Sequence, residues 1–309
     1  MSSTATPSPN IIWIFGDQHR AQALGHAGDP NVHTPALDAM AASGVRLTNA
    51  VSGCPWCTPF RGSLMTSRYI HDCVQQTPQH MDPSLPVVTD VFNAHGYTTA
   101  YFGKWHLGGS NHKVFVPREE RGRFDLWLGY ENNNAQYDSW IHGHDLEGRD
   151  DQEPLAEKLD SYETDALTDR FIDFLERYGQ DSPFFAVLSV QPPHNPHIAP
   201  PAYMDRHDPD DIVLRPNVPD IPRIVNRERE ELAGYYAQIE NLDWNVGRIL
   251  ASLEALGLDE NTHVLFFSDH GDMHGSHGYT RKSSPWEEAV RIPFIAQPAG
   301  GARVQPETD

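Results

Sequence analysis

The sequence predicts an α/β fold in which helices flank a mostly parallel central sheet. Four short apolar runs lack the alternation of a half-exposed strand, and this pattern is typical of parallel strands that are buried on both faces. The runs cover residues 10–15, 97–102, 183–190 and 262–267. Helical periodicities separate the runs, and strands that alternate with helices favour a parallel sheet with right-handed crossovers.

Two segments carry the clearest helical periodicity. Apolar residues recur at spacings of three and four over 167–178, and Gly179 follows as a C-cap. A longer helix is predicted from about residue 227 to residue 256, where Gly257 ends it.

Two further stretches interrupt this pattern of strands and helices. Residues 141–181 are rich in Asp and Glu, and residues 192–222 are rich in proline. Outside the predicted helix, we interpret both as loops or solvated surface.

Length and charge limit the number of domains and the kinds of partner. The chain has 309 residues with a formal net charge of −20, which fits one large α/β domain and disfavours nucleic acid as a partner. We expect a disordered tail at 1–9, one domain at 10–296 and a short tail at 297–309.

No apolar run reaches the roughly 18 residues of a membrane span and no secretion signal is recognisable, so we expect a cytoplasmic protein without a membrane partner.

Polar side chains follow each of the four apolar runs. In open α/β sheets, ligands bind beyond the carboxyl ends of the strands. The groups at these positions are, in chain order, Asp17 with Gln18, Lys104 with His106, His194, and Asp269 with His270. Each group alone would more often begin a turn or cap a helix, but their shared position favours a functional site. The oxygen and imidazole groups among them suit a divalent cation such as Ca²⁺, Mg²⁺ or Mn²⁺.

Two cysteine motifs overlap in residues 53–68. Cys54-Pro-Trp-Cys57 is a C-x-x-C, the pattern of a dithiol redox site. Cys57-Thr-Pro-Phe-Arg61 is a C-x-P-x-R. With Cys73, the chain has three cysteines, which cannot form an even disulfide framework, so metal binding or catalysis deserves more weight than structural disulfides.

The C-x-P-x-R motif resembles the modification signature of the type I sulfatases, the formylglycine-dependent branch of the alkaline phosphatase superfamily. Residues 64–68 continue the signature, and residues 29–50 resemble the stretch that precedes the family's cysteine. Other similar segments occur in the family's order: 103–108, 268–273, 275–278, Lys282 and Glu287-Glu288. The resemblance runs from residue 10 to about residue 295, and an ordered set of this kind is far more specific than one short motif.

The resemblance implies a metal-dependent sulfuric ester hydrolase that acts on a small-molecule or carbohydrate sulfate monoester. A formylglycine-generating enzyme would oxidise Cys57 to formylglycine (3-oxoalanine), whose hydrate supplies a hydroxyl nucleophile. The family pattern also implies one divalent cation, with Ca²⁺ expected ahead of Mn²⁺ or Mg²⁺. Its ligands would be Asp17, Gln18, the modified Cys57, Asp269 and His270.

The remaining catalytic roles are implied by the same resemblance. Arg61 would hold the nucleophile and help to anchor the sulfate, and Lys104 and Lys282 would contact the sulfuryl oxygens and stabilise their charge. His194 would assist the leaving group. His106 would deprotonate the second hydroxyl, so that the covalent adduct collapses to the aldehyde and expels sulfate.

Departures from the family pattern leave two alternatives open. Phe60 and Ser67 stand where a small residue and a glycine are usual, so the efficiency of the modification is in question. Gln18 and His270 resemble the pattern of the phosphonate monoester hydrolase branch, which keeps a phosphonate monoester or phosphodiester hydrolase as the alternative. The small C-terminal antiparallel subdomain of the family has no counterpart after residue 296, so a truncated, catalytically impaired binding protein is a third hypothesis.

Overall fold

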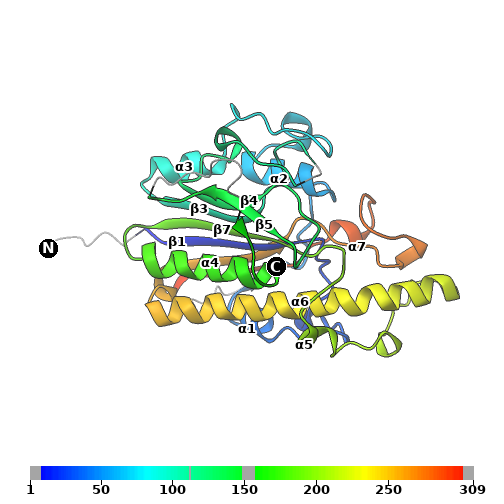
Figure 1. The fold of residues 1–309 in the computed structure, drawn as a ribbon. Helices are drawn as coiled ribbons and strands as arrows, with labels where there is room; N and C mark the ends of the chain where they lie inside the picture. The colour runs from blue at the N-terminus through cyan, green and yellow to red at the C-terminus, as the bar shows by residue number, and fades with distance from the viewer. Residues whose placement is uncertain (1–7, 111–112, 148–156, 302–309) are drawn as a thin grey trace, which may run out of the picture.

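The computed structural model describes residues 8–110, 113–147 and 157–301, and its centre is a nine-stranded sheet (Figure 1). The order of the strands is β2-β9-β8-β1-β7-β3-β4-β5-β6. Their bounds are β1 Asn10–Asp17, β2 Val45–Arg46, β3 Thr98–Lys104, β4 Leu126–Tyr130, β5 Trp140–His144, β6 Glu157–Lys158, β7 Phe184–Pro193, β8 Thr262–Ser268 and β9 Phe294–Gln297.

The central strands of this sheet are parallel, which confirms the predicted fold class. β8, β1, β7, β3 and β4 pair in parallel, whereas β9, β2, β5 and β6 add antiparallel strands at the two edges. The four apolar runs became β1, β3, β7 and β8, and every residue of β7 is buried.

Helices cover both faces of the sheet (Figure 1). On one face lie α1 (Pro35–Ser43), α4 (Glu163–Tyr178) and α6 (Pro222–Leu256), whose apolar side chains share a core with the sheet. On the other face lie α2 (Cys57–Thr66) and α3 (Val88–Ala94), which pack around a second, more aromatic core. Two further helices are short: α5 (Pro201–Met204), which packs against α6, and α7 (Glu287–Val290).

Both glycines predicted to end helices do so. The N–H of Gly179 donates to Leu175 O after α4, and Gly257 adopts a left-handed conformation with φ of 66° after α6. The long helix starts at Pro222 and not near residue 227, because proline is well suited to the first turn of a helix, where its missing N–H leaves no bond unmade.

The interpretation of residues 141–181 as loop or solvated surface, apart from the helix, was wrong at its start. β5 lies at Trp140–His144 and most of it is buried. The polar residues of β5 interrupt the apolar pattern by which a buried strand is recognised in a sequence. Their burial is tolerated because they are hydrogen-bonded: Val116 N donates to His142 Nε2 at 2.9 Å. The part of the stretch at 148–156 lies outside the described residues.

The predicted tails fall mostly outside the described residues, which leave out 1–7 and 302–309. Gln297, where the C-terminal tail was expected to begin, is the last residue of β9 and pairs with Val264. Within the described part of the chain, no helix combines the length and the hydrophobicity needed to cross a bilayer.

Replacement of Phe171 by alanine tests the packing of α4 on the sheet. Phe171 is fully buried, and its ring lies 5.4 Å from that of Phe102 on β3. We expect Phe171→Ala to lower the free energy of unfolding by about 3–5 kcal/mol, measured by chemical denaturation. Val91→Ala, at an exposed position of α3, is the control and should change it by no more than about 0.5 kcal/mol. Equal effects of the two substitutions would contradict this packing.

Candidate active site

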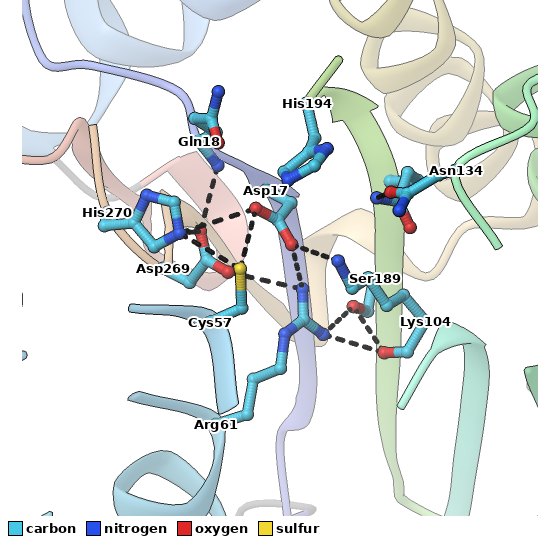
Figure 2. Close-up of polar contacts among 12 residues, drawn as sticks. Asp17, Gln18, Cys57, Arg61, Lys104, Asn134, Ser189, His194, Asp269 and His270 are labelled. Carbon is cyan, nitrogen blue, oxygen red and sulfur yellow. Dashed lines mark hydrogen bonds and ion pairs between the residues drawn. The ribbon is translucent and has the colours of Figure 1, made fainter. Parts of the chain in front are cut away.

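The polar groups that follow the apolar runs converge at one edge of the sheet (Figure 2). Asp17 ends β1 and Lys104 ends β3, while His194 follows β7 and Asp269 follows β8. Convergence results from topology, because β8, β1, β7 and β3 are parallel neighbours whose carboxyl ends share an edge.

Cys57 and Arg61 reach the same edge from α2. Cys57 is the first residue of the helix, and Arg61 lies one turn later on the same side. The Sγ atom of Cys57 lies 3.4 Å from Asp17 Oδ1 and 3.2 Å from His270 Nε2. Burial and the Asp17 carboxylate raise the pKa of the Cys57 thiol, but the cations around it more than reverse this and hold the pKa well below its usual value.

Four of the predicted metal ligands form one compact cluster. Asp17, Cys57, Asp269 and His270 are buried, and each offers a ligand atom within 4.8 Å of the others. His270 Nδ1 lies 2.9 Å from the carbonyl oxygen of Gly271, which can only accept, so Nδ1 carries the hydrogen. Nε2 therefore faces the cluster, and it presents its lone pair when the ring is neutral, as in a metal ligand. Two carboxylates and an imidazole fit a divalent cation.

Gln18 joins this cluster through an amide whose orientation is fixed. Its Nε2 donates to Asp272 Oδ2 at 2.5 Å, so its Oε1 faces the opposite way and accepts from Lys282 Nζ at 2.6 Å. The backbone N–H of Gln18 donates to Asp269 Oδ1 at 3.0 Å. Asp272 had no role in the sequence analysis, although it lies in the motif at 268–273.

Three cations surround the two carboxylates. Lys104 Nζ lies 2.6 Å from Asp17 Oδ2, and Lys282 Nζ lies 3.3 Å from Cys57 Sγ. The guanidinium of Arg61 lies 3.4 Å from Asp17 and 3.5 Å from Asp269. Three cations against two carboxylates leave this group with a positive formal charge, whether Cys57 and His270 are both neutral or form a thiolate–imidazolium pair, in a chain whose net charge is −20. The site therefore offers a local attraction for an anion.

The two carboxylates titrate differently because their neighbours differ. Burial alone would raise the pKa of Asp17, but Lys104 and Lys282 hold it well below the usual range. Burial and repulsion from Asp17 raise the pKa of Asp269 to about 6. Divergent pKa values in one buried group of residues are typical of functional sites.

Ser189 is a site residue that the sequence analysis missed. Its hydroxyl accepts from Arg61 Nη1 at 2.8 Å and donates to the backbone oxygen of Lys104 at 2.9 Å. Arg61 Nη1 also donates to that oxygen at 2.7 Å, so Ser189 holds the Arg61 guanidinium against the backbone of Lys104. It lies inside the apolar run that forms β7, where no local pattern distinguishes it from a residue of the core.

The two predicted catalytic histidines lie beyond the ends of β7 and β3. His194 points toward Asp17 (Figure 2) and its Nδ1 lies 2.7 Å from Asn195 O, so the neutral ring has an acceptor at Nε2. Burial, then Lys282, lowers the pKa of His194 to about 3. His106 is buried two residues beyond β3, with a left-handed φ of 58°. Its catalytic role stays a prediction.

The cysteine pair of the C-x-x-C motif is reduced. Cys54 is half-buried and Cys57 is buried, and neither forms a disulfide. Burial raises the pKa of Cys54.

Comparisons with known proteins agree on one family. A family model described as Sulfatase matches residues 9–308. The chain is 40% identical to an ulvan-active sulfatase of Formosa agariphila over 94% of its own length, and 31% identical to an endo-4-O-sulfatase of Bacteroides thetaiotaomicron over 97%. It spans only 56% and 66% of these two relatives. The YidJ protein of Bacteroides fragilis has a similar structure, with a TM-score of 0.85 at 29% identity over 96% of this chain and 69% of that one.

A double-mutant cycle tests the buried pair of Asp17 and Lys104. In chelator-treated protein, Asp17→Asn leaves buried cations without their partner and should lower the free energy of unfolding by about 3–5 kcal/mol. Lys104→Met added to it should recover part of the loss, giving a coupling energy of about 2 kcal/mol by chemical denaturation.

The ion pair of Asp90 and Arg123 provides the control for this cycle. Its nitrogen and oxygen lie 2.6 Å apart, but both side chains are more than one-third exposed. Its coupling energy should stay below about 1 kcal/mol. A coupling between Asp17 and Lys104 as small as this control would show that the buried ion pair does not form.

Proposed function

Because this chain belongs to the sulfatase family, we propose that it hydrolyses sulfate monoesters with a nucleophile made from Cys57. The observation that carries the proposal is the place of Cys57: at the start of α2, against two carboxylates, an imidazole and the Lys282 ammonium. Carboxylate-rich sites suit hard cations, which prefer oxygen ligands to sulfur. Conversion of Cys57 to formylglycine places an oxygen where the thiol stands.

The modification requires a partner, the formylglycine-generating enzyme. Cys57 is only 4% exposed and starts a helix packed on the sheet. The enzyme must therefore reach this cysteine before α2 docks, that is, on an incompletely folded chain.

The metal ligands in this proposal are Asp17, Gln18, Asp269 and His270, together with the modified Cys57. A divalent cation, with Ca²⁺ expected first, supplies two effects when bound: it lowers the pKa of a hydroxyl and neutralises charge on the sulfate oxygens. Lys104 and Lys282 stand on either side of Asp17 and would contact these oxygens as charge develops on them. Arg61, fixed by Ser189, holds the nucleophile in place.

The two histidines complete the proposal as proton carriers. His194 must be protonated at Nε2 before it can donate to a leaving oxygen. A bound sulfate next to the ring favours the charged imidazole and so opposes the low pKa of the free site. His106 would remove the proton from the second hydroxyl of the formylglycine hydrate, which allows sulfate to leave.

The substrate class that we propose is a carbohydrate sulfate ester, because one relative, 28% identical, is an N-acetylgalactosamine-6-sulfatase of Mus musculus. One observation favours a second candidate, a phosphonate monoester hydrolase. Gln18 supplies a neutral amide oxygen at a site where a second carboxylate would add negative charge, and its orientation is held by Asp272. A sulfate monoester and a phosphonate monoester each carry one negative charge, but the phosphonate oxygens are more basic and gain more from a cation with fewer anionic ligands.

Replacement of Cys57 tests the nucleophile. We expect Cys57→Ala, produced together with the modifying enzyme and loaded with Ca²⁺, to lose turnover of an aryl sulfate by about 10⁴-fold or more. Cys73→Ala is the matched control and should stay near wild type, because among the described residues Cys73 Sγ hydrogen-bonds only to Tyr69 O, outside the site. Peptide mass spectrometry should find formylglycine at position 57 of the active protein, and an unmodified Cys57 in fully active protein would refute the mechanism.

The wild-type protein, produced with the modifying enzyme and loaded with Ca²⁺, distinguishes the remaining functions. Faster turnover of an aryl sulfate than of the matching aryl phosphonate supports a sulfatase, and the reverse supports a phosphonate hydrolase. Absence of turnover of both, with formylglycine and metal present, would instead support a binding protein.

The dependence of rate on the leaving group tests His194. If this ring protonates the departing oxygen, His194→Ala should lower kcat/KM by about 10²–10³ for an alkyl sulfate, whose leaving group is poor. The loss should be only about tenfold or less for nitrophenyl sulfate, which needs little protonation. His71→Ala, at an exposed side chain, is the control. A uniform loss over all leaving groups would exclude this role.

A further inference from the structure

A second group of potential metal ligands lies where α6 packs against the loops that follow β7 and β8. Glu228 and Glu231 lie one turn apart on α6, and His274 lies in the loop after β8. Each offers a ligand atom within 4.8 Å of the others. His197, in the loop after β7, adds Nε2 at 3.9 Å from Glu231 Oε2. The proposed sulfatase site uses none of these four residues.

Several buried polar atoms in this group have no hydrogen-bond partner among the described residues. They are Glu228 Oε2, both ring nitrogens of His274, and His197 Nε2. The side chains of Glu228 and His274 are fully buried, and that of His197 is 6% exposed. Unpaired polar atoms are costly inside a protein and few in native structures, so four of them on three neighbouring side chains indicate a missing ligand.

The hydrogen bond of His197 shows which of its nitrogens faces the group. Gln238 donates through Nε2 to the backbone oxygens of His194 and Pro196, so its Oε1 is an acceptor. His197 Nδ1 lies 3.1 Å from that oxygen and must carry the hydrogen. The lone pair of Nε2 therefore points toward Glu231. A histidine whose other nitrogen is held by a hydrogen bond is the usual form of a metal ligand.

The separations fit ligands around an ion better than direct hydrogen bonds. His274 Nδ1 lies 3.6 Å from Glu228 Oε2, and this distance is too long for a hydrogen bond. Two ligands about 2.0–2.1 Å from a tetrahedral ion lie about 3.4 Å apart. The 3.9 Å between His197 and Glu231 needs only a small closure to reach the same spacing.

The backbone allows this close approach at Gly234. A Cβ atom on Gly234 would stand 2.3 Å from His197 O, so any larger residue would push the loop away from α6. The glycine thus brings His197 next to the face of α6 that carries Glu231.

Two arginines would compete with a metal ion for the carboxylates of Glu228 and Glu231. Arg227 Nε donates to Glu228 Oε1 at 2.8 Å and leaves Oε2 available. Arg281 Nη1 lies 3.1 Å from Glu231 Oε2, but it is 40% exposed and can turn into solvent. Glu231 is 26% exposed, which gives an ion a path from the surface.

We propose that Glu228, Glu231, His197 and His274 form a second metal site, which takes a borderline divalent cation such as Zn²⁺. Two imidazoles and two carboxylates suit zinc better than calcium. The site is joined to the first through Asp272, whose Oδ1 lies 3.8 Å from His274 Nε2 and whose Oδ2 accepts from Gln18.

The proposal is tested by metal titration of a variant whose first cluster has lost two of its potential ligands. Cys57→Ala combined with Asp269→Asn removes two groups of the first cluster, so that Zn²⁺ calorimetry and Co²⁺ absorption report on the second. We expect one equivalent of Zn²⁺ per chain and the visible bands of four-coordinate Co²⁺. Adding His274→Asn or Glu231→Gln should weaken binding about 100-fold. Adding Arg281→Ala should tighten it about tenfold, because a competing cation is gone.

Glu230→Gln is the matched control, because Glu230 is an exposed neighbour on the same helix and should leave binding unchanged. Thermal unfolding of each metal-free variant checks that it is folded. Glu231 is partly exposed, so Glu231→Gln keeps the test valid if His274→Asn does not fold. Absence of stoichiometric binding, or equal affinity in Glu231→Gln and Glu230→Gln, would overturn the proposal. Neither result depends on whether the protein hydrolyses a sulfate ester.

Discussion

The placement of charge at the carboxyl edge of the sheet is the constraint on which the rest of the structure depends. Asp17 and Asp269 are fully buried, and such carboxylates persist as anions only if cations or hydrogen-bond donors stand next to them. Lys104 and Arg61 meet this need at Asp17, and Arg61 also reaches Asp269. Because Lys104 ends β3 and Arg61 lies on α2, the charge balance ties the ends of both elements to Asp17 at the end of β1.

The sheet brings these groups together without any one segment containing the site. Its central strands are parallel, so their carboxyl ends meet at one edge, and helices on both faces bury their apolar residues. The start of α2 then places Cys57 at that edge, with Ser189 holding the backbone of β3 and the side chain of Arg61. The rigidity of the scaffold is what allows a cationic group to face an anionic ester in an acidic chain.

The two clusters of potential ligands differ in the way that their charges are balanced. In the first, three cations exceed two carboxylates, so an anion finds net attraction. In the second, each glutamate has one arginine, while His197 Nε2 and both ring nitrogens of His274 have no hydrogen-bond partner within the described residues. Asp272 contacts both, because it orients Gln18 and lies near His274. A change at either cluster therefore has a physical route to the other.

The sequence by itself determined the α/β class, the four central strands, two helix ends and the residues that gather around Cys57, because these features depend on local patterns and on ordered motifs. It did not reveal β5, whose buried histidines interrupt any apolar pattern, or Ser189, which looks like a core residue of β7. The orientation of Gln18 by Asp272 and the proximity of His197 to Glu231 were decided by the tertiary structure alone. Such contacts join residues far apart in the chain, and their geometry exists only once the sheet, α6 and the loops have packed.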